Sequence, residues 1–340
     1  MTDHELELRL KNTVEACTPD VLEKVMAECD NCKEKQRDKK KYGERSISDI
    51  SGLSKKKSFR KFISMAAMFA VMVGIGIVGS SQYNKIQVVS IVQFDVNPSV
   101  EIQINKKEEV VKAAGINADG EKILSGMKLT GLDVYTATNA LVGSLLKHGY
   151  IDELSNSILL SVEDGDSLRG SKLQEGLTGE MSAILKSASI NASILSQYVD
   201  EEKVTQVSLE SQQYGISHGK AALIEQILKS NEKYSFDELA VLSVNELNLI
   251  ISNPKNQVQN VQTSGEAAKD AYIGEKNANQ IAFAHAKVEE SNVYNLEVEI
   301  DYEFGTMVYD VEFTSDNKEY EYFIDALNGE ILEGNVEQED

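Results

Sequence analysis

The feature that most constrains this chain is an uncharged, strongly apolar segment that begins after residue 61. Phe62 to Val78 reads FISMAAMFAVMVGIGIV, and the next charged residue is Lys85. About 20 helical residues at roughly 1.5 Å each are enough to cross a hydrocarbon core of about 30 Å. We therefore expect a transmembrane helix over residues 62–81, in a single-pass membrane protein.

Two other interpretations of this segment remain open. A buried helix of a soluble protein is usually shorter and carries a polar face. A cleaved signal peptide lies at the extreme N-terminus, whereas this segment starts 61 residues into the chain. The small residues 79–81 (GSS) that follow it nevertheless resemble a weak cleavage site.

The charges that flank the segment predict its orientation. Five basic residues precede it closely, and Lys85 is the only cation shortly after it. These five are Lys55, Lys56, Lys57, Arg60 and Lys61. The positive-inside rule then places residues 1–61 in the cytoplasm and the rest of the chain outside, with the protein in the cell membrane. The three cysteines fall on the reducing cytoplasmic side.

The overall charge excludes one class of partner. The chain has 340 residues, with 34 basic and 55 acidic side chains and a net charge of −21. Proteins that bind nucleic acid depend on cations to neutralise phosphates. We therefore expect no nucleic-acid partner.

The predicted cytoplasmic part has a helical segment and a linker. Residues 1–32 contain two short amphipathic patterns that are too small to bury an apolar face alone, so we expect them to dock on a partner. The expected anchors are Leu10, Val14, Leu22 and Val25. Residues 33–61 are basic, which favours a juxtamembrane linker near anionic lipid. Cys29 and Cys32 form a CxxC, but structural zinc needs four ligands, so we expect no metal or cofactor.

The first outer block, residues 84–252, has the pattern of a mixed α+β domain. An apolar run from Val88 to Phe94 leads into a period-two alternation from Asp95 to Ile104. A long amphipathic helical region begins near Glu121. Further strands are expected at Ser157–Val162 and Lys203–Leu209, and helices at Gly219–Lys229 and Phe236–Ile251.

A polar segment, residues 253–266, separates this block from a smaller one and is expected to be a linker. Residues 267–338 predict a helix followed by an antiparallel meander, which is a small α+β domain. The helix is expected at Ala278–Val288 and the strands at Tyr294–Tyr302, Thr306–Thr314 and Glu319–Ala326.

Several stretches resemble known families. The run VVSIVQFDVNPSVEIQINKKEEVVKAAGIN after the apolar segment is similar to the extracytoplasmic domain of RsgI-type anti-sigma factors, as are GLDVYTATNALVGSLLKHGYI and YGISHGKAALIEQI. This resemblance covers residues 84–252. The stretches GEKNANQIAFAHAKV and MVYDVEFTSDNKEYEYFIDALNGEIL resemble a PepSY domain.

The resemblance implies a transmembrane anti-sigma factor. Its cytoplasmic end would sequester an alternative (SigI-type) sigma factor, and its outer part would sense an unidentified extracytoplasmic signal. A break outside the membrane, followed by a site-2-type intramembrane protease, would release the sigma factor. This chain departs from the family in its helical N-terminus and in carrying a PepSY-like block at its C-terminus.

Two other functions are compatible with the sequence. One is a membrane-anchored inhibitor or modulator of an extracytoplasmic protease, which acts through the PepSY-like block. The other is an anchored surface-binding protein with an inert cytoplasmic tail. We find no arrangement of residues typical of a multiple-turnover enzyme.

The dipeptide Asn97-Pro98 predicts a single-turnover self-cleavage. An Asn side-chain nitrogen can attack its own backbone carbonyl, and the competing attack by the next backbone nitrogen is closed because proline has no N–H. The alternation places Asp95 and Ser99 on the same face as Asn97, where either residue could polarise the carbonyl or protonate the leaving nitrogen. The alternative is a plain turn between two strands. Asn253-Pro254 is the same dipeptide in the expected linker, so it serves as an internal control.

Overall fold

The computed structural model describes residues 86–256 and 258–338. The predicted transmembrane segment, the docking anchors Leu10, Val14, Leu22 and Val25, and the CxxC therefore lie outside the described residues. Within the described ranges, no helix is both long enough and apolar enough to cross a membrane.

The first domain is built on a six-stranded mixed sheet with the strand order β3-β2-β1-β4-β5-β6. Its strands are β1 (Ser90–Asp95), β2 (Ser99–Ile104), β3 (Val110–Gly115), β4 (Ser157–Asp164), β5 (Ser193–Val199) and β6 (Val261–Ser264). β4 and β5 run parallel, and every other neighbouring pair is antiparallel. β1 is therefore an interior strand with a partner on each side.

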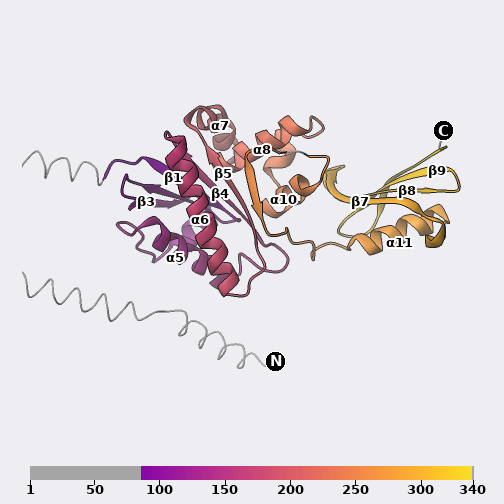
Figure 1. Ribbon diagram of the computed structural model, residues 1–340, viewed down its shortest axis with the longest axis horizontal. Coiled ribbons are helices and arrows are strands. Elements are labelled where there is room, and N and C mark those ends of the chain that lie inside the picture. The colour runs from indigo at the N-terminus through magenta and orange to yellow at the C-terminus, as the bar shows by residue number, and fades with distance from the viewer. Residues whose placement is uncertain (1–85, 257, 339–340) are drawn as a thin grey trace, which may run out of the picture. The chain divides into compact units, whose positions relative to one another are not determined.

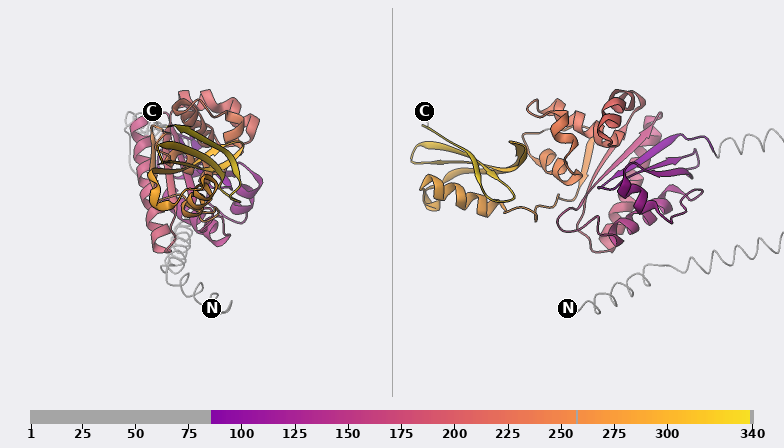
Figure 2. Two further views of the ribbon diagram at one scale, coloured as in Figure 1. Left: turned by 90° about the vertical axis from the view of Figure 1, so that its right-hand side faces the viewer. Right: turned by 180° about the vertical axis from the view of Figure 1, so that it is seen from behind.

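Helices cover both faces of this sheet (Figures 1 and 2). One face packs against α4 (Ala118–Leu124), α5 (Val134–Lys147) and α6 (Ser167–Ser187). The other face packs against α8 (His218–Ser230), α9 (Phe236–Ala240) and α10 (Val244–Ser252), and α7 (Glu201–Tyr214) packs beside α8. Adjacent residues of β4 point to opposite faces, so Ile158 joins the first cluster and Leu159 the second.

Polar N-caps begin the helices of this domain. Asp or Ser side chains accept a backbone N–H at the start of α5 to α10, and Asn117 does so for α4. Such caps satisfy amide groups that have no partner within the helix. One of these caps, Ser217 at the start of α8, also reaches the end of β1.

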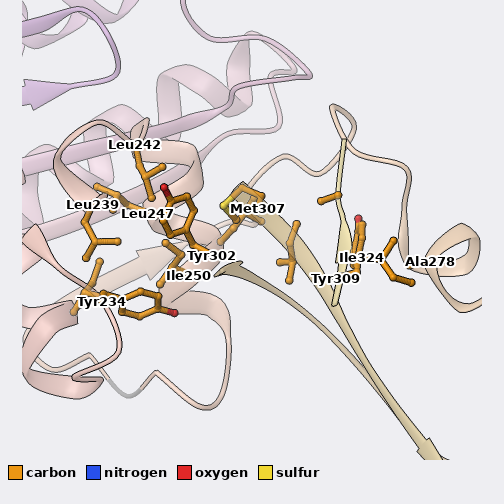
Figure 3. Packing of buried hydrophobic residues seen from close by; sticks show 14 of the residues in the cluster. Tyr234, Leu239, Leu242, Leu247, Ile250, Ala278, Tyr302, Met307, Tyr309 and Ile324 are labelled. Atoms are coloured by element: carbon orange, nitrogen blue, oxygen red, sulfur yellow. The ribbon is translucent and has the colours of Figure 1, made fainter. Parts of the chain in front are cut away.

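The second domain is a four-stranded antiparallel sheet covered on one face by a helix; the helix and the first three strands agree with the sequence prediction, and the fourth strand was not predicted. The helix is α11 (Glu275–Ala286), and the strands are β7 (Tyr294–Glu303), β8 (Thr306–Ser315), β9 (Lys318–Asp325) and β10 (Ile331–Gln338). Phe283 of α11 meets Phe313 of β8 edge-to-face, with ring centroids 5.0 Å apart. One apolar cluster contains residues of α9 and α10 together with residues of β7 to β9 (Figure 3).

Two sequence-based expectations are wrong. The strand expected at Lys203–Leu209 lies within helix α7, which starts at the N-cap Asp200. The segment 253–266, expected to be a linker, contains β6, which pairs with β5 and adds an edge strand to the sheet. Asn253 itself is the C-cap of α10 and is buried.

Candidate functional site

The predicted cleavage bond lies at the tip of the hairpin between β1 and β2. Asp95 and Ser99 are cross-strand partners, and the backbone N–H of Val96 donates to the carbonyl of Pro98 at 2.9 Å. Asn97 is therefore the single residue that reverses the chain. The return hydrogen bond, from residue 98 to the carbonyl of Val96, cannot form because Pro98 has no N–H.

Asn97 has a backbone conformation that L-amino acids rarely adopt. Its φ is 85°, and its side chain is exposed. Tight turns centred on a residue with φ near +75° are uncommon and strained. A non-glycine residue in such a region costs about 1–3 kcal/mol, and asparagine is among the residues that tolerate it best. The strain therefore lies at the residue whose carbonyl forms the Asn97–Pro98 bond.

The strands on both sides hold this turn in place. β1 is bonded to β2 on one side and to β4 on the other. The backbone N–H of Ser99 donates to Asn117 Oδ1 at 3.2 Å, and the Ser99 carbonyl accepts from Ile116 at 2.8 Å. These bonds do not involve the Asn97–Pro98 peptide, so breaking it would leave both new ends paired in the sheet.

The control dipeptide has a different geometry. Asn253 has φ −69° and ψ 124°, which is ordinary extended backbone. Its Nδ2 lies 3.3 Å from Asp301 Oδ2, and its Oδ1 accepts the backbone N–H of Lys255 at 2.8 Å. Asn253 therefore has no backbone strain, and its side-chain nitrogen is already used in a hydrogen bond.

Asp95 is a buried carboxyl immediately before the turn. It is 1% exposed, and its Oδ2 accepts from the Ser217 hydroxyl at 2.5 Å. Its Oδ1 is buried and has no hydrogen-bond partner. Burial raises the pKa of Asp95 above its ordinary value of 3.8, against the hydrogen bond from Ser217, the nearby Ser99 hydroxyl and the charge of Lys220. The charge of Glu163 on the neighbouring strand raises it further.

The first residues of α8 bind several side chains of the sheet. The Gly219 N–H donates to Gln93 Oε1 at 2.8 Å, and its carbonyl accepts from Gln197 at 2.7 Å. A Cβ at Gly219 would lie 2.1 Å from Ser161 Oγ, so only glycine fits this close approach. The α8 N-terminus is therefore fixed against β1, β4 and β5.

Two charged residues of α8 face the same region. His218 Nδ1 lies 3.0 Å from Glu163 Oε1, a contact that raises the pKa of His218. Lys220 donates from Nζ to the carbonyl oxygens of Ala240 and Leu242, at 2.9 and 2.5 Å. Burial lowers the pKa of Lys220, while the Asp95 carboxyl acts against this shift.

Sequence reasoning identified some of these residues and missed others. Asn97, Pro98, Asp95 and Ser99 lie at one hairpin. The expectation of one continuous alternation that places Asn97 on the face of Asp95 is wrong, because the chain reverses at Asn97, whose side chain is exposed while Asp95 is buried. Ser217, which bonds to Asp95 across a sequence separation of 122 residues, was missed. The motif SHGK at residues 217–220 carries no local signal that would place it beside β1.

Among the described residues, one carboxylate group has the spacing of a metal site. Asp310, Glu312 and Glu321 lie on the second domain's sheet with ligand atoms within 4.8 Å of one another. Lys255 already lies 3.2 Å from Asp310 and 2.8 Å from Glu312. A lysine of the chain itself therefore forms ion pairs with two of these three acids.

Comparison with known proteins matches both domains to families. Residues 89–226 match the anti-sigma factor RsgI-like central domain, and residues 273–335 match the peptidase propeptide and YPEB (PepSY) domain. The chain thus combines an RsgI-like central domain with a C-terminal PepSY domain, which confirms the resemblance inferred from the sequence. The turn at Asn97 lies inside the RsgI-like domain.

Curated relatives include two proteins of Acetivibrio thermocellus. Anti-sigma-I factor RsgI7 is 24% identical over 56% of this chain and 34% of its own length. Anti-sigma-I factor RsgI6 is 26% identical over 59% of this chain and 28% of its own length. The chain thus spans about a third of the length of these relatives. An uncharacterized protein of Streptococcus pyogenes, Spy1430, is 34% identical over 24% of this chain and 63% of its own length.

Proposed function

We propose that the protein is a single-pass membrane anti-sigma factor that sequesters an alternative, SigI-type sigma factor on its cytoplasmic side. The observation that carries this proposal is the RsgI-like central domain at residues 89–226, which the chain shares with relatives named anti-sigma-I factors. In this proposal the segment of residues 1–32 binds the sigma factor, and the segment 62–81 anchors the chain in the bilayer.

Signalling in this proposal begins with self-cleavage between Asn97 and Pro98. The side-chain nitrogen Nδ2 of Asn97 attacks its own backbone carbonyl carbon and forms a succinimide. The bond to Pro98 breaks, and Pro98 becomes a free N-terminus. The positive φ of Asn97 supports this step, because a strained, fixed turn supplies part of the barrier reduction.

Cleavage alone does not release the sigma factor. After the bond breaks, the N-terminal fragment ends in β1, which is paired with β2 and β4 inside the sheet. An extracytoplasmic signal or a force must withdraw β1 before the remaining stub becomes a substrate for a site-2-type intramembrane protease. The interior position of β1 makes the cleaved protein a stable, poised intermediate.

A co-purification experiment tests the sigma-binding part. The full-length chain in detergent micelles, mixed with a purified SigI-type sigma factor, is expected to retain it in a one-to-one complex. Leu22→Asp places a charge at an expected anchor and should abolish retention, whereas Asn97→Ala should leave it unchanged. Failure of the full-length chain to retain the sigma factor would contradict the proposal.

The PepSY domain supports one alternative. Its family description includes peptidase propeptides, so the chain could instead act as a membrane-anchored modulator of an extracytoplasmic protease. Inhibition of such a protease by the full-length chain, together with no sigma-factor binding, would favour this function.

A further inference from the structure

The hairpin tip and the N-terminus of α8 meet at one buried carboxyl. Asp95 lies one residue before the Val96–Pro98 reversal and is a cross-strand partner of Ser99. Pro98 is buried, while the Asn97 side chain is exposed. The Asp95 carboxyl group and the leaving Pro98 nitrogen therefore lie within three residues of each other at a partly buried chain reversal.

The hydrogen bonds around Ser217 determine where a proton on Asp95 can lie. Ser217 Oγ accepts the backbone N–H of Lys220 at 2.8 Å, as the N-cap of α8. The same hydroxyl donates its proton to Asp95 Oδ2 at 2.5 Å. Because Oδ2 is an acceptor, the proton of a neutral Asp95 lies on Oδ1, which is buried and has no other partner.

We propose that Asp95 delivers the Oδ1 proton to the Pro98 nitrogen as the Asn97–Pro98 bond breaks, and that Ser217 is the positioning residue that keeps the proton on this atom. This inference rests on the self-cleavage proposed above. An amide nitrogen is a poor leaving group unless it is protonated, so a placed acid acts where the reaction needs it.

The step balances as follows. Nδ2 of Asn97 forms a bond to the backbone carbon of Asn97, and the bond from that carbon to the Pro98 nitrogen breaks. The Pro98 nitrogen takes the Asp95 proton and becomes a secondary amine. The proton lost by Nδ2 passes to solvent water, to which the exposed Asn97 side chain is open. The resulting Asp95 carboxylate keeps the hydrogen bond from Ser217 and the favourable charge of Lys220.

Ser99 serves less well as the acid. Its hydroxyl faces the same carboxyl, but an alcohol gives up a proton far less readily than a carboxylic acid. Burial raises the pKa of Asp95, which keeps a larger fraction of it in the acid form that the reaction uses. The charged groups around it are Lys220 on α8 and Glu163 on β4, and His218 is paired with Glu163.

The cleavage rate should depend on pH, because only the protonated form of Asp95 can donate the proton. The cleavage rate should be highest at low pH and fall as pH rises through the folded-state pKa of Asp95. Ser217 stabilises the charged form, so Ser217→Ala should raise this pKa further and move the midpoint of the rate profile to higher pH. The same variant should also be slower, since its acid proton is no longer held on Oδ1.

The experiment uses the full-length chain synthesised into lipid vesicles, with the appearance of the Pro98 N-terminus followed over time and pH. General-acid groups contribute about 10²–10⁴-fold, so Asp95→Asn should slow cleavage by about 100-fold or more and remove the pH midpoint. Ser217→Ala should slow cleavage by about tenfold at low pH and shift the midpoint upward. Ser217→Thr, which keeps the hydroxyl, should restore both.

Ser243→Ala is the matched control, because Ser243 is also a helix N-cap serine of this domain but caps α10. It should leave the rate and the midpoint unchanged. A Ser217→Ala chain with the wild-type rate and midpoint would overturn the inference, as would an Asp95→Asn chain with the wild-type profile. If Ser217→Ala fails to fold, the cleavage rates and pH profiles of Asp95→Asn and the wild-type chain still test the role of Asp95. No Pro98 terminus from the wild-type chain would instead overturn the proposed self-cleavage itself.

Discussion

The strain at Asn97 predicts a difference between two variants that cannot cleave. Asn97→Ala keeps a Cβ at φ 85°, whereas Asn97→Gly removes it. A left-handed conformation costs a residue with a Cβ about 1–2 kcal/mol, and glycine loses about 0.4–1 kcal/mol more chain entropy than alanine on folding. The glycine variant should therefore be more stable by about 1 kcal/mol. For a folded region of this size, that is a rise of about 2–4 °C in Tm.

The measurement is thermal unfolding followed by tyrosine fluorescence, since the chain has 13 Tyr and no Trp. The matched control is Asn253, whose φ is −69°. There the order should reverse, with Asn253→Ala more stable than Asn253→Gly, because no strain opposes alanine. Equal Tm values for Asn97→Ala and Asn97→Gly would refute the argument that the turn is strained.

Three further predictions follow from the same account. In an Asn97→Ala background, Asp95→Asn should flatten the dependence of the free energy of unfolding on pH. Because the pKa of Asp95 is raised in the folded state, the stability that its protonated form contributes is fully present below pH 3.8 and is lost as pH rises through the folded-state pKa. Urea titrations of the two chains between about pH 3.5 and about pH 8 measure this difference, and parallel curves of stability against pH would contradict the assignment. Leu22→Asp should weaken sigma-factor binding at least tenfold by isothermal titration, and unchanged affinity would exclude Leu22 as an anchor. Cys29 should resist a membrane-impermeant maleimide on intact cells, whereas labelling from outside would reverse the predicted topology.

Local patterns were sufficient to predict part of the fold. The meander of the second domain was placed almost residue by residue, because β7, β8 and β9 alternate clearly and are separated by short turns. In this meander the period-two signal and the turn residues lie within a few positions of each other. The hairpin at Asn97-Pro98 was only the alternative to a continuous alternation from Asp95 to Ile104, and the structure shows the hairpin.

In other segments, tertiary packing determines a secondary structure that differs from the one the local sequence pattern predicts. The segment Lys203–Leu209 contains β-branched residues and was predicted to be a strand, but Asp200 caps a helix there and Val207 packs with Val199 and Ala221. Helix α6 was not predicted, and it contains three glycines, which lower helix propensity. One of them, Gly170, lies against the Tyr198 ring, where a Cβ would be 2.5 Å away.

The candidate site also contains residues that the sequence could identify and a residue that it could not. Asn97, Pro98, Asp95 and Ser99 are neighbours in sequence, so the chemistry of the dipeptide was enough to single them out, but the strand period did not predict the chain reversal at Asn97. Ser217 reaches Asp95 only because α8 packs across the sheet against β1. A contact over 122 residues has no local signature, and a single sequence contains no information that would pair the two residues.

The central claim is self-cleavage at one specific bond, and intact-mass analysis of the purified full-length chain tests it most directly. After incubation of the folded chain, we expect two fragments, one beginning at Pro98 and one ending at Asn97 that is lighter by one water than a free carboxyl terminus. Asn97→Ala should remain intact, and the Asn253-Pro254 bond should stay whole. A wild-type chain that remains one piece, or that breaks equally at Pro254, would contradict the account.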